Sequence, residues 1–207
     1  DDSIDNRSTL EIRNNIKSDY NIIRGPKQKN GRFAALFVGF KWILKNIQTD
    51  IFVELDTDAS HRFKDFNKGY KEIQNNNDLV NGSKYLKESV VKGRTLDRVF
   101  FSTSVSLFCK FLFSNKISDF TNGYRFYNKK IIKKILNNPM VFDSPCESLN
   151  IVLFAILIKA KIKEFPTKYI GNDISHWSNN YFYVFLNFFK TFYIIIVYLM
   201  KIYIFRK

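Results

Sequence analysis

Residues 51–61 read IFVELDTDASH, an apolar run of strand-forming residues that ends in two carboxylates one residue apart. Side chains two positions apart in an extended segment point to the same side, so Asp56 and Asp58 would reach the same point. In open α/β sheets, ligands bind at the carboxyl end of a buried strand. Two hard oxygen ligands there suit Mg²⁺ or Mn²⁺ holding a diphosphate. A strand followed by an Asp-rich turn is the alternative, because Asp favours turns and helix N-caps.

The elements before this stretch predict an α/β fold. We expect a short helix over residues 8–16, a strand over 20–24 and an amphipathic helix over 33–46. With one strand placed ahead of them, these elements form the opening of a nucleotide-binding α/β half. The chain begins on Asp1-Asp2 without Met, so we expect an N-terminal truncation that has removed this first strand.

The later elements continue the alternation of helices and strands. We expect helices over residues 63–74, 96–113, 129–136 and 145–160, strands over 78–83 and 161–169, and a charged loop over 86–95. Pro166 would place the last of these strands at a sheet edge, because proline cannot donate to a ladder.

The composition narrows the class of partner. A net charge of +14 on 207 residues suits nucleic acid, an anionic membrane or phosphorylated ligands. The lysines are scattered and no RNA- or DNA-binding motif is visible, so we expect a membrane surface and a nucleotide-linked substrate, and no nucleic acid. Two cysteines, Cys109 and Cys146, make no disulfide framework and fit a reduced compartment.

Residues 181–205 form an apolar tail. Its longest uncharged run, residues 191–200, is too short to span a bilayer by itself. Lys190 and Lys201 fall on one narrow polar stripe with Asn187 nearby, which fits a helix lying in the membrane interface. A tilted transmembrane span with snorkelling lysines and a helix packed on the protein's own core are the alternatives.

Several motifs in order resemble glycosyltransferase family 2, most closely its polyprenol-phosphate branch, which is dolichol-phosphate mannosyltransferase-like. The motifs are DDSID at residues 1–5, NGRFAAL at 30–36, LDTDASH at 55–61, NGSKY at 81–85, RVFFS at 98–102, DFTNGYRFY at 119–127, and IKEFP at 162–166 after Glu147. We therefore expect an N-terminally truncated transferase domain over residues 1–178 and a hydrophobic C-terminal helix over 179–207.

The resemblance implies a GT-A fold, with a mixed, mainly parallel central sheet flanked by helices. It implies a nucleotide-sugar donor and a divalent cation, Mg²⁺ or Mn²⁺. In that family the first carboxylate loop holds the nucleoside, which points here to Asp1, Asp2 and Asp5. The Asp-x-Asp motif holds metal and diphosphate, which makes Asp58 the main catalytic metal ligand and places Asp56 between the metal and the nucleotide.

The acceptor decides which further chemistry is needed. A lipid phosphate is already an anion, so it needs cations rather than a strong base. The candidate phosphate-binding residues are Lys84, Arg98 and Arg125, with Ser102 as a hydrogen-bond donor. A glycan hydroxyl would need a carboxylate base, and Asp119 is the first candidate.

Structural roles for the same residues stay open. Asp119 would equally cap the turn before Thr121, Arg125 would serve as a buried ion-pair partner, and Glu147 would serve a structural role on its apolar helix. The chain also departs from the family pattern. Lys84 stands where an Arg is usual, which keeps the charge and loses the bidentate fork, and Arg32-Phe33 replaces Lys-Gly.

The sequence thus predicts a divalent-dependent glycosyltransferase on the cytoplasmic face of a membrane. It would move a sugar from a nucleotide-sugar donor to a lipid phosphate, such as polyprenol or dolichol phosphate, or to a glycan. The alternative is a catalytically impaired or truncated module that only binds the membrane surface. A nucleic-acid-binding protein is a weaker third reading, based on charge alone.

Overall fold

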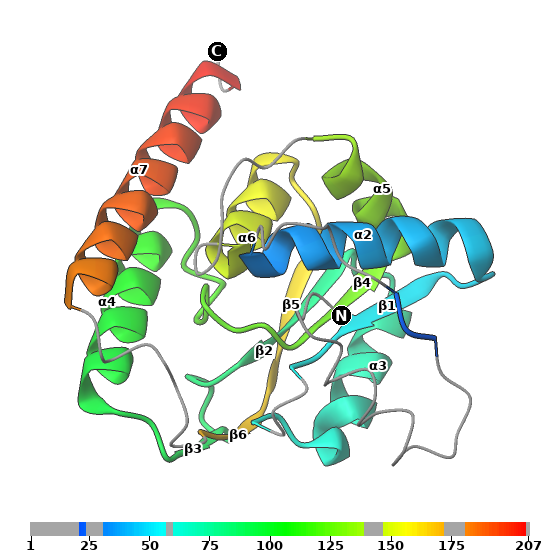
Figure 1. The fold of residues 1–207 in the computed structure, drawn as a ribbon, viewed down its shortest axis with the longest axis horizontal. Coiled ribbons are helices and arrows are strands. Elements are labelled where there is room, and N and C mark those ends of the chain that lie inside the picture. Colours follow the sequence, from blue (N-terminus) through cyan, green and yellow to red (C-terminus); the bar gives the residue numbers. More distant parts are fainter. Residues whose placement is uncertain (1–20, 24–30, 57–59, 139–146, 172–180, 206–207) are drawn as a thin grey trace.

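The structure is a computed structural model that describes residues 21–23, 31–56, 60–138, 147–171 and 181–205 (Figure 1). Helices and strands alternate along most of the chain. In order, the described elements are α2 (Gly31–Asn46), β1 (Ile51–Glu54), the 3₁₀ turn η1 (Phe63–Asp65), α3 (Phe66–Gln74), β2 (Leu79–Ser83), β3 (Val90–Lys92), α4 (Leu96–Leu112), β4 (Arg125–Asn128), α5 (Lys129–Leu136), α6 (Glu147–Leu157), β5 (Ile162–Pro166), β6 (Lys168–Ile170) and α7 (Tyr181–Phe205).

The central sheet of the described residues has four strands in the order β1-β4-β2-β5. β4 is antiparallel to both of its neighbours, and Phe126 lies opposite Val53 on one side and Val80 on the other. β2 and β5 are parallel. Hence β1, β2 and β5 run in one direction and β4 runs against them. Two of the three pairings in this sheet are antiparallel and one is parallel, so the sheet is mixed, as the resemblance implies, and the α/β class is confirmed.

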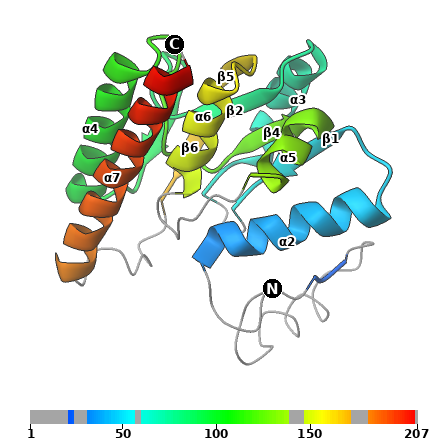
Figure 2. The same ribbon diagram turned by 90° about the horizontal axis from the view of Figure 1, so that it is seen from above.

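Helices cover both faces of this sheet, as Figures 1 and 2 show. Side chains alternate between the faces along each strand. Leu79 and Tyr127 belong to a large apolar core that includes residues of α2, α4, α5, α6 and α7. Val80 and Phe126 belong to a smaller core that α3 closes through Ile73. The period-two pattern of β2 and β4 therefore places one helical layer on each face.

Apolar periodicity predicts most helices to within two residues. Residues 33–46, 96–113 and 129–136 are expected as helices, and α2, α4 and α5 occupy them. The expected strand over residues 20–24 is not seen at 21–23, the part of it that the structure describes, because no described segment forms a ladder there.

The strand expected over residues 161–169 is divided after Pro166. β5 pairs with β2 at the end of the sheet, the edge position that proline favours. β6 turns away and pairs in parallel with β3, with Val90 opposite Lys168. The loop prediction for residues 86–95 is therefore wrong at β3, because its partner strand lies far along the chain and only tertiary pairing creates it.

The bounds of α7 agree with the expected tail helix. Its inner face is buried on the core, and the hydroxyl of Tyr198 donates to Oδ1 of Asn150 on α6 at 2.7 Å. Asn187 lies on this buried face, not on the polar stripe that the sequence predicts, because it shares the face of Ile194. By length and composition α7 is the only helix in the described ranges able to cross a membrane, over Leu186–Ile204 with mean hydropathy 1.4.

Candidate active site

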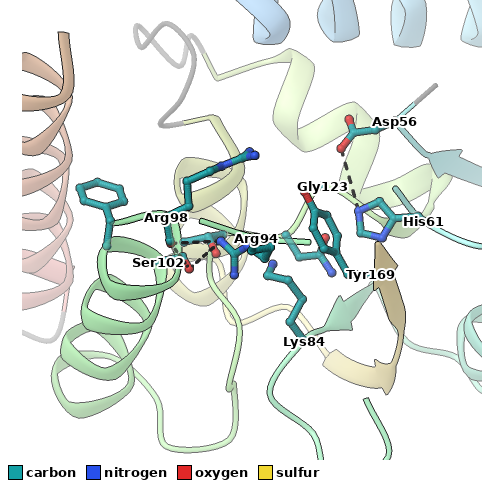
Figure 3. A pocket seen from close by; sticks show the side chains of 11 residues that line it. Asp56, His61, Lys84, Arg94, Arg98, Ser102, Gly123 and Tyr169 are labelled. Carbon is teal, nitrogen blue, oxygen red and sulfur yellow. Dashed lines mark hydrogen bonds and ion pairs between the residues drawn. The ribbon is translucent and has the colours of Figure 1, made fainter. Parts of the chain in front are cut away.

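A cavity of about 170 Å³ opens at the edge of the sheet where β1 and β2 end and β4 begins. Figure 3 shows its lining side chains. The cavity brings together residues from five separate parts of the chain. Its lining residues are Asp56, His61, Lys84, Arg94, Arg98, Phe101, Ser102, Thr121, Asn122, Gly123 and Tyr169. Among the lining residues that the structure describes, three cations and one carboxylate suit a ligand with several negative charges.

The first turns of α4 supply one wall of the cavity. Arg98 and Ser102 are one turn apart, as the sequence predicts, and the Ser102 hydroxyl donates to the Arg98 carbonyl at 2.8 Å. Arg94, which the sequence analysis missed, donates to the Ser102 hydroxyl at 2.9 Å and lies over the ring of Tyr169. Arg94 precedes Arg98 by four residues, and this spacing is the feature of the sequence that could have indicated a place at the same site.

Lys84 and Asp119 form a buried ion pair beside the cavity. Lys84 Nζ lies 2.8 Å from Asp119 Oδ2, and the two side chains are 5% and 0% exposed. The other carboxylate oxygen accepts from the backbone N–H and the hydroxyl of Thr121, both at 3.0 Å. Burial raises the pKa of Asp119, but Lys84 and these hydrogen bonds outweigh it and hold the pKa below its usual value. Asp119 thus caps the turn and holds Lys84, and it does not line the cavity.

Arg32 lies against the carboxylate of Asp56. Its Nη2 is 2.8 Å from Asp56 Oδ1 and 2.6 Å from Glu54 Oε1, and its Nη1 is 3.3 Å from Glu147 Oε1. The Asp56 side chain is 36% exposed and faces the cavity, with Oδ2 3.9 Å from Nε2 of His61. Asp56 is therefore both a wall of the cavity and one member of a carboxylate cluster around Arg32.

Arg125 is not among the residues that line the cavity. It is fully buried, and it donates to Asn81 Oδ1 at 3.1 Å and to the Ser148 carbonyl at 2.6 Å. Its Nη1 is 4.0 Å from Oε2 of Glu54, and the same oxygen also accepts a short hydrogen bond from the Tyr127 hydroxyl. The geometry matches the structural ion-pair role that the sequence left open, with no direct access to a ligand in the cavity.

The metal-site prediction lies partly outside the described residues. Asp58 and the predicted nucleoside ligands Asp1, Asp2 and Asp5 are among the residues that the structure does not describe. Among the described residues, no group of three His, Cys, Asp or Glu side chains is arranged to hold a metal ion. The Asp56 carboxylate faces the cavity, and Oε2 of Glu147 is buried with no hydrogen-bond partner among the described residues. Hard oxygen atoms of this kind fit Mg²⁺ or Mn²⁺.

An apolar cavity of about 370 Å³ lies between α4 and α7. It is lined by Phe100, Phe101, Ser104, Val105, Phe108, Phe188, Thr191, Phe192 and Ile195. Phe101 lines both this cavity and the cationic one. The charged cavity and the apolar groove are therefore neighbours, with the Phe101 side chain as a wall of both.

Both helices that form the groove also expose large apolar side chains. α4 exposes Leu96, Phe100, Leu107, Phe108 and Phe111, and α7 exposes Leu186, Phe188, Phe189, Phe192, Tyr193, Ile196, Met200, Tyr203 and Ile204. The two helices lie side by side at one end of the molecule in both views (Figures 1 and 2). Exposed apolar area on this scale marks a surface that binds a partner or a membrane.

The sequence model of the family described as Glycosyl transferase family 2 matches residues 1–136 of the chain. The chain is 26% identical, over 70% of its length, to polyprenol monophosphomannose synthase of Mycolicibacterium smegmatis. It is 28% identical, over 78% of its length, to dolichol-phosphate mannosyltransferase of Pyrococcus furiosus. It is also 28% identical, over 52% of its length, to undecaprenyl-phosphate mannosyltransferase of Micrococcus luteus. These matches cover 55%, 43% and 43% of the respective relatives, so the chain spans about half their length.

Proposed function

Since the chain belongs to glycosyl transferase family 2, we propose that it transfers a sugar from a nucleotide-sugar donor to the phosphate of a polyprenol-type lipid. The three relatives are named for mannose transfer to polyprenol, dolichol and undecaprenyl phosphates. Mannose is accordingly the first sugar to test. In this proposal residues 1–178 are the transferase domain and residues 179–207 the C-terminal helix.

One observation carries the choice of a lipid phosphate over a glycan. Phe101 lines the cationic cavity on one side and the apolar groove on the other. A lipid phosphate has the same two parts, a charged head and an apolar chain. Most hydroxyls of a glycan would find no polar partner in the groove between α4 and α7, because seven of its nine described lining side chains are apolar.

The cations of the cavity would hold the acceptor phosphate. Lys84, Arg94 and Arg98 line the cavity. The Arg94 guanidinium lies over the Tyr169 ring, and Lys84 Nζ is 5.9 Å from the centroid of the same ring. An oxygen of this phosphate forms a bond to the anomeric carbon of the sugar, and the bond from that carbon to the donor diphosphate breaks. The electron pair leaves on the diphosphate. No strong base is needed, so Asp119 serves by holding Lys84 in place.

The donor end of the site would be built on Asp56 and Asp58. These carboxylates would hold Mg²⁺ or Mn²⁺, which would offset the negative charge that grows on the departing diphosphate. Asp1, Asp2 and Asp5 are proposed to contact the nucleoside. Asp56 supports this arrangement because its carboxylate faces the same cavity as the acceptor-binding cations.

The acceptor also requires the protein to lie at a membrane. We propose that the exposed aromatic side chains of α4 and α7 enter the lipid, on the cytoplasmic side, while the inner face of α7 stays on the core. The groove between them would then open to the acyl region, from which a polyprenol chain can enter without crossing water.

The test is sugar transfer in vesicles that contain polyprenyl phosphate, with GDP-mannose and then UDP-sugars as donors and with Mn²⁺ present. We expect lipid-linked product from the wild type and loss of at least 100-fold, on the order of one oxyanion-stabilising contact, in Asp58→Asn. Asp50→Asn, an exposed carboxylate removed in the same way, is the control and keeps activity. Full activity in Asp58→Asn contradicts the metal role.

Failure of transfer with every donor, together with retained vesicle binding, would favour the membrane-binding module without transferase activity.

A further inference from the structure

The guanidinium of Arg32 occupies the centre of the carboxylate cluster at the donor end of the site. Its two terminal nitrogens lie within 3.3 Å of carboxylate oxygens of Glu54, Asp56 and Glu147. Gly123 leaves the space for it, because a Cβ at that position would lie 2.6 Å from Nη2 of Arg32. Arg32 enters the cluster from the first turn of α2, where the family pattern differs from this chain.

The cluster needs a cation there when no ligand is bound. Glu54 and Glu147 are almost entirely buried, and a buried carboxylate without a counter-charge is costly. Arg125 contacts Glu54 from the other side at 4.0 Å, so Arg32 is the nearer cation. Asp56 is different, because its carboxylate is partly exposed and reaches the cavity. Arg32 thus holds in place the one carboxylate of the cluster that a ligand can reach.

A divalent cation and Arg32 would compete for Asp56. Both bind carboxylate oxygens, and two positive groups a few ångströms apart repel each other. A donor diphosphate changes this balance, because it is an anion that can take the guanidinium as a bidentate partner. Arg32 has a long side chain that can turn from one anion to another without movement of α2.

We propose that Arg32 keeps a divalent cation off Asp56 until the donor diphosphate draws it away, so that metal and donor bind together. Arg32 is a positioning residue in this scheme. The inference rests on the proposed function for the identity of the donor, but its first half, the exclusion of free metal, concerns this chain's own residues alone. Its consequence is a measurable coupling between metal and nucleotide, and such a coupling is reciprocal.

The experiment measures Mn²⁺ binding to the full chain by electron paramagnetic resonance, without nucleotide and then with saturating GDP or, separately, UDP. We expect Arg32→Gln to bind Mn²⁺ alone about tenfold more tightly than the wild type. Nucleotide should tighten Mn²⁺ binding to the wild type about tenfold and to Arg32→Gln much less. Lys41→Gln removes one exposed charge from the same helix and is the control, which should match the wild type.

Gly123→Ala is the second variant, because it displaces the guanidinium and keeps its charge. It should also bind free Mn²⁺ more tightly, and it decides the question alone if Arg32→Gln does not fold. Cooperative unfolding of each variant shows that it is folded. If the folded variants bind free Mn²⁺ no more tightly than the wild type, the proposal is wrong. Absence of nucleotide binding by the wild type would instead count against the proposed function and the release step, while the order of affinities for Mn²⁺ alone still decides the role of Arg32.

Discussion

The ammonium group of Lys84 lies 2.8 Å from the carboxylate of Asp119, and neither side chain has more than 5% of its surface exposed. Lys84 lines the cationic cavity, and Asp119 lies behind it. The buried carboxylate of Asp119 therefore fixes the position of the Lys84 ammonium group at the wall of the cavity. The ion pair therefore contributes both to the stability of the fold and to the geometry of the site.

Asp119→Asn should destabilise the protein by about 3 kcal/mol, because it leaves the Lys84 ammonium buried without a counter-charge. The measurement is urea unfolding at pH 7. Asp50→Asn, at an exposed carboxylate, is the control and should change the free energy of unfolding by less than about 0.5 kcal/mol. A change in Asp119→Asn as small as the control's would show that the pair contributes nothing net.

The same pair predicts a dependence on pH. The pKa of Asp119 is lowered on folding, so its stabilisation is present above the unfolded pKa of about 4 and is lost as the pH falls through the folded value. The difference in unfolding free energy between the wild type and Asp119→Asn should therefore stay constant from about pH 5 to 8 and shrink below about pH 4. A difference that grows on acidification would reverse the sign assigned here.

Arg94→Gln should raise the KM for polyprenyl phosphate about tenfold and leave the KM for the donor unchanged, because Arg94 lines the cationic cavity beside Ser102, where we propose that the acceptor phosphate binds. Arg94→Lys should restore only part of the loss, since lysine lacks the planar fork. The readout is initial transfer rates at varied acceptor. Lys92→Gln removes an exposed cation two residues earlier and is the control. An equal rise in the KM for polyprenyl phosphate in Lys92→Gln would mean that Arg94 acts only through the net charge of the protein.

Phe100→Ser and Phe111→Ser should weaken binding to anionic lipid vesicles without loss of thermal stability. These side chains are 76% and 88% exposed on α4, so their replacement removes apolar area from the surface and none from the core. Vesicle co-sedimentation measures the effect, expected at about fivefold for each change. Phe63→Ser, at an equally exposed phenylalanine before α3, should bind like the wild type. Weaker vesicle binding in all three variants would mean that any exposed aromatic side chain contributes to binding, wherever it lies on the surface.

Gly69→Ala should destabilise the protein by about 1–3 kcal/mol, because an added methyl group on α3 would overlap the Phe126 ring on β4. Gly39→Ala is the matched control, since Gly39 lies within α2 and no atom of the described residues lies within 4 Å of its Cβ position. There alanine should stabilise by about 0.5–1 kcal/mol through helix propensity. Thermal unfolding of the two variants measures both signs. Equal effects would contradict the close packing of α3 on the sheet.

Local pattern was enough for most of the architecture. The apolar spacing over residues 33–46 and 129–136 places α2 and α5, because a helix must bury a stripe that recurs every 3.6 residues. The run at residues 51–54 becomes β1, and the carboxylate after it, Asp56, reaches the cavity. The end of a strand is a local property, so the sequence could indicate this part of the site.

Contacts between distant segments were beyond the sequence. β3 exists only because β6, nearly eighty residues later, lies beside it. The burial of Asp119 and Arg125 likewise depends on how the chain packs around them, and so does their distance from the cavity. Arg94 reaches Ser102 and Tyr169 together only once β6 is in place.

The sequence by itself determined the α/β class, most of the helices and the residue types at the site, because periodicity and turn chemistry act over a few residues. Only the tertiary structure decided which charges meet. Arg32 and Glu147 are 115 residues apart in the chain and form an ion pair at 3.3 Å, because α2 and α6 contribute to the same core on one face of the sheet. Charge pairing follows that packing, and no local pattern contains it.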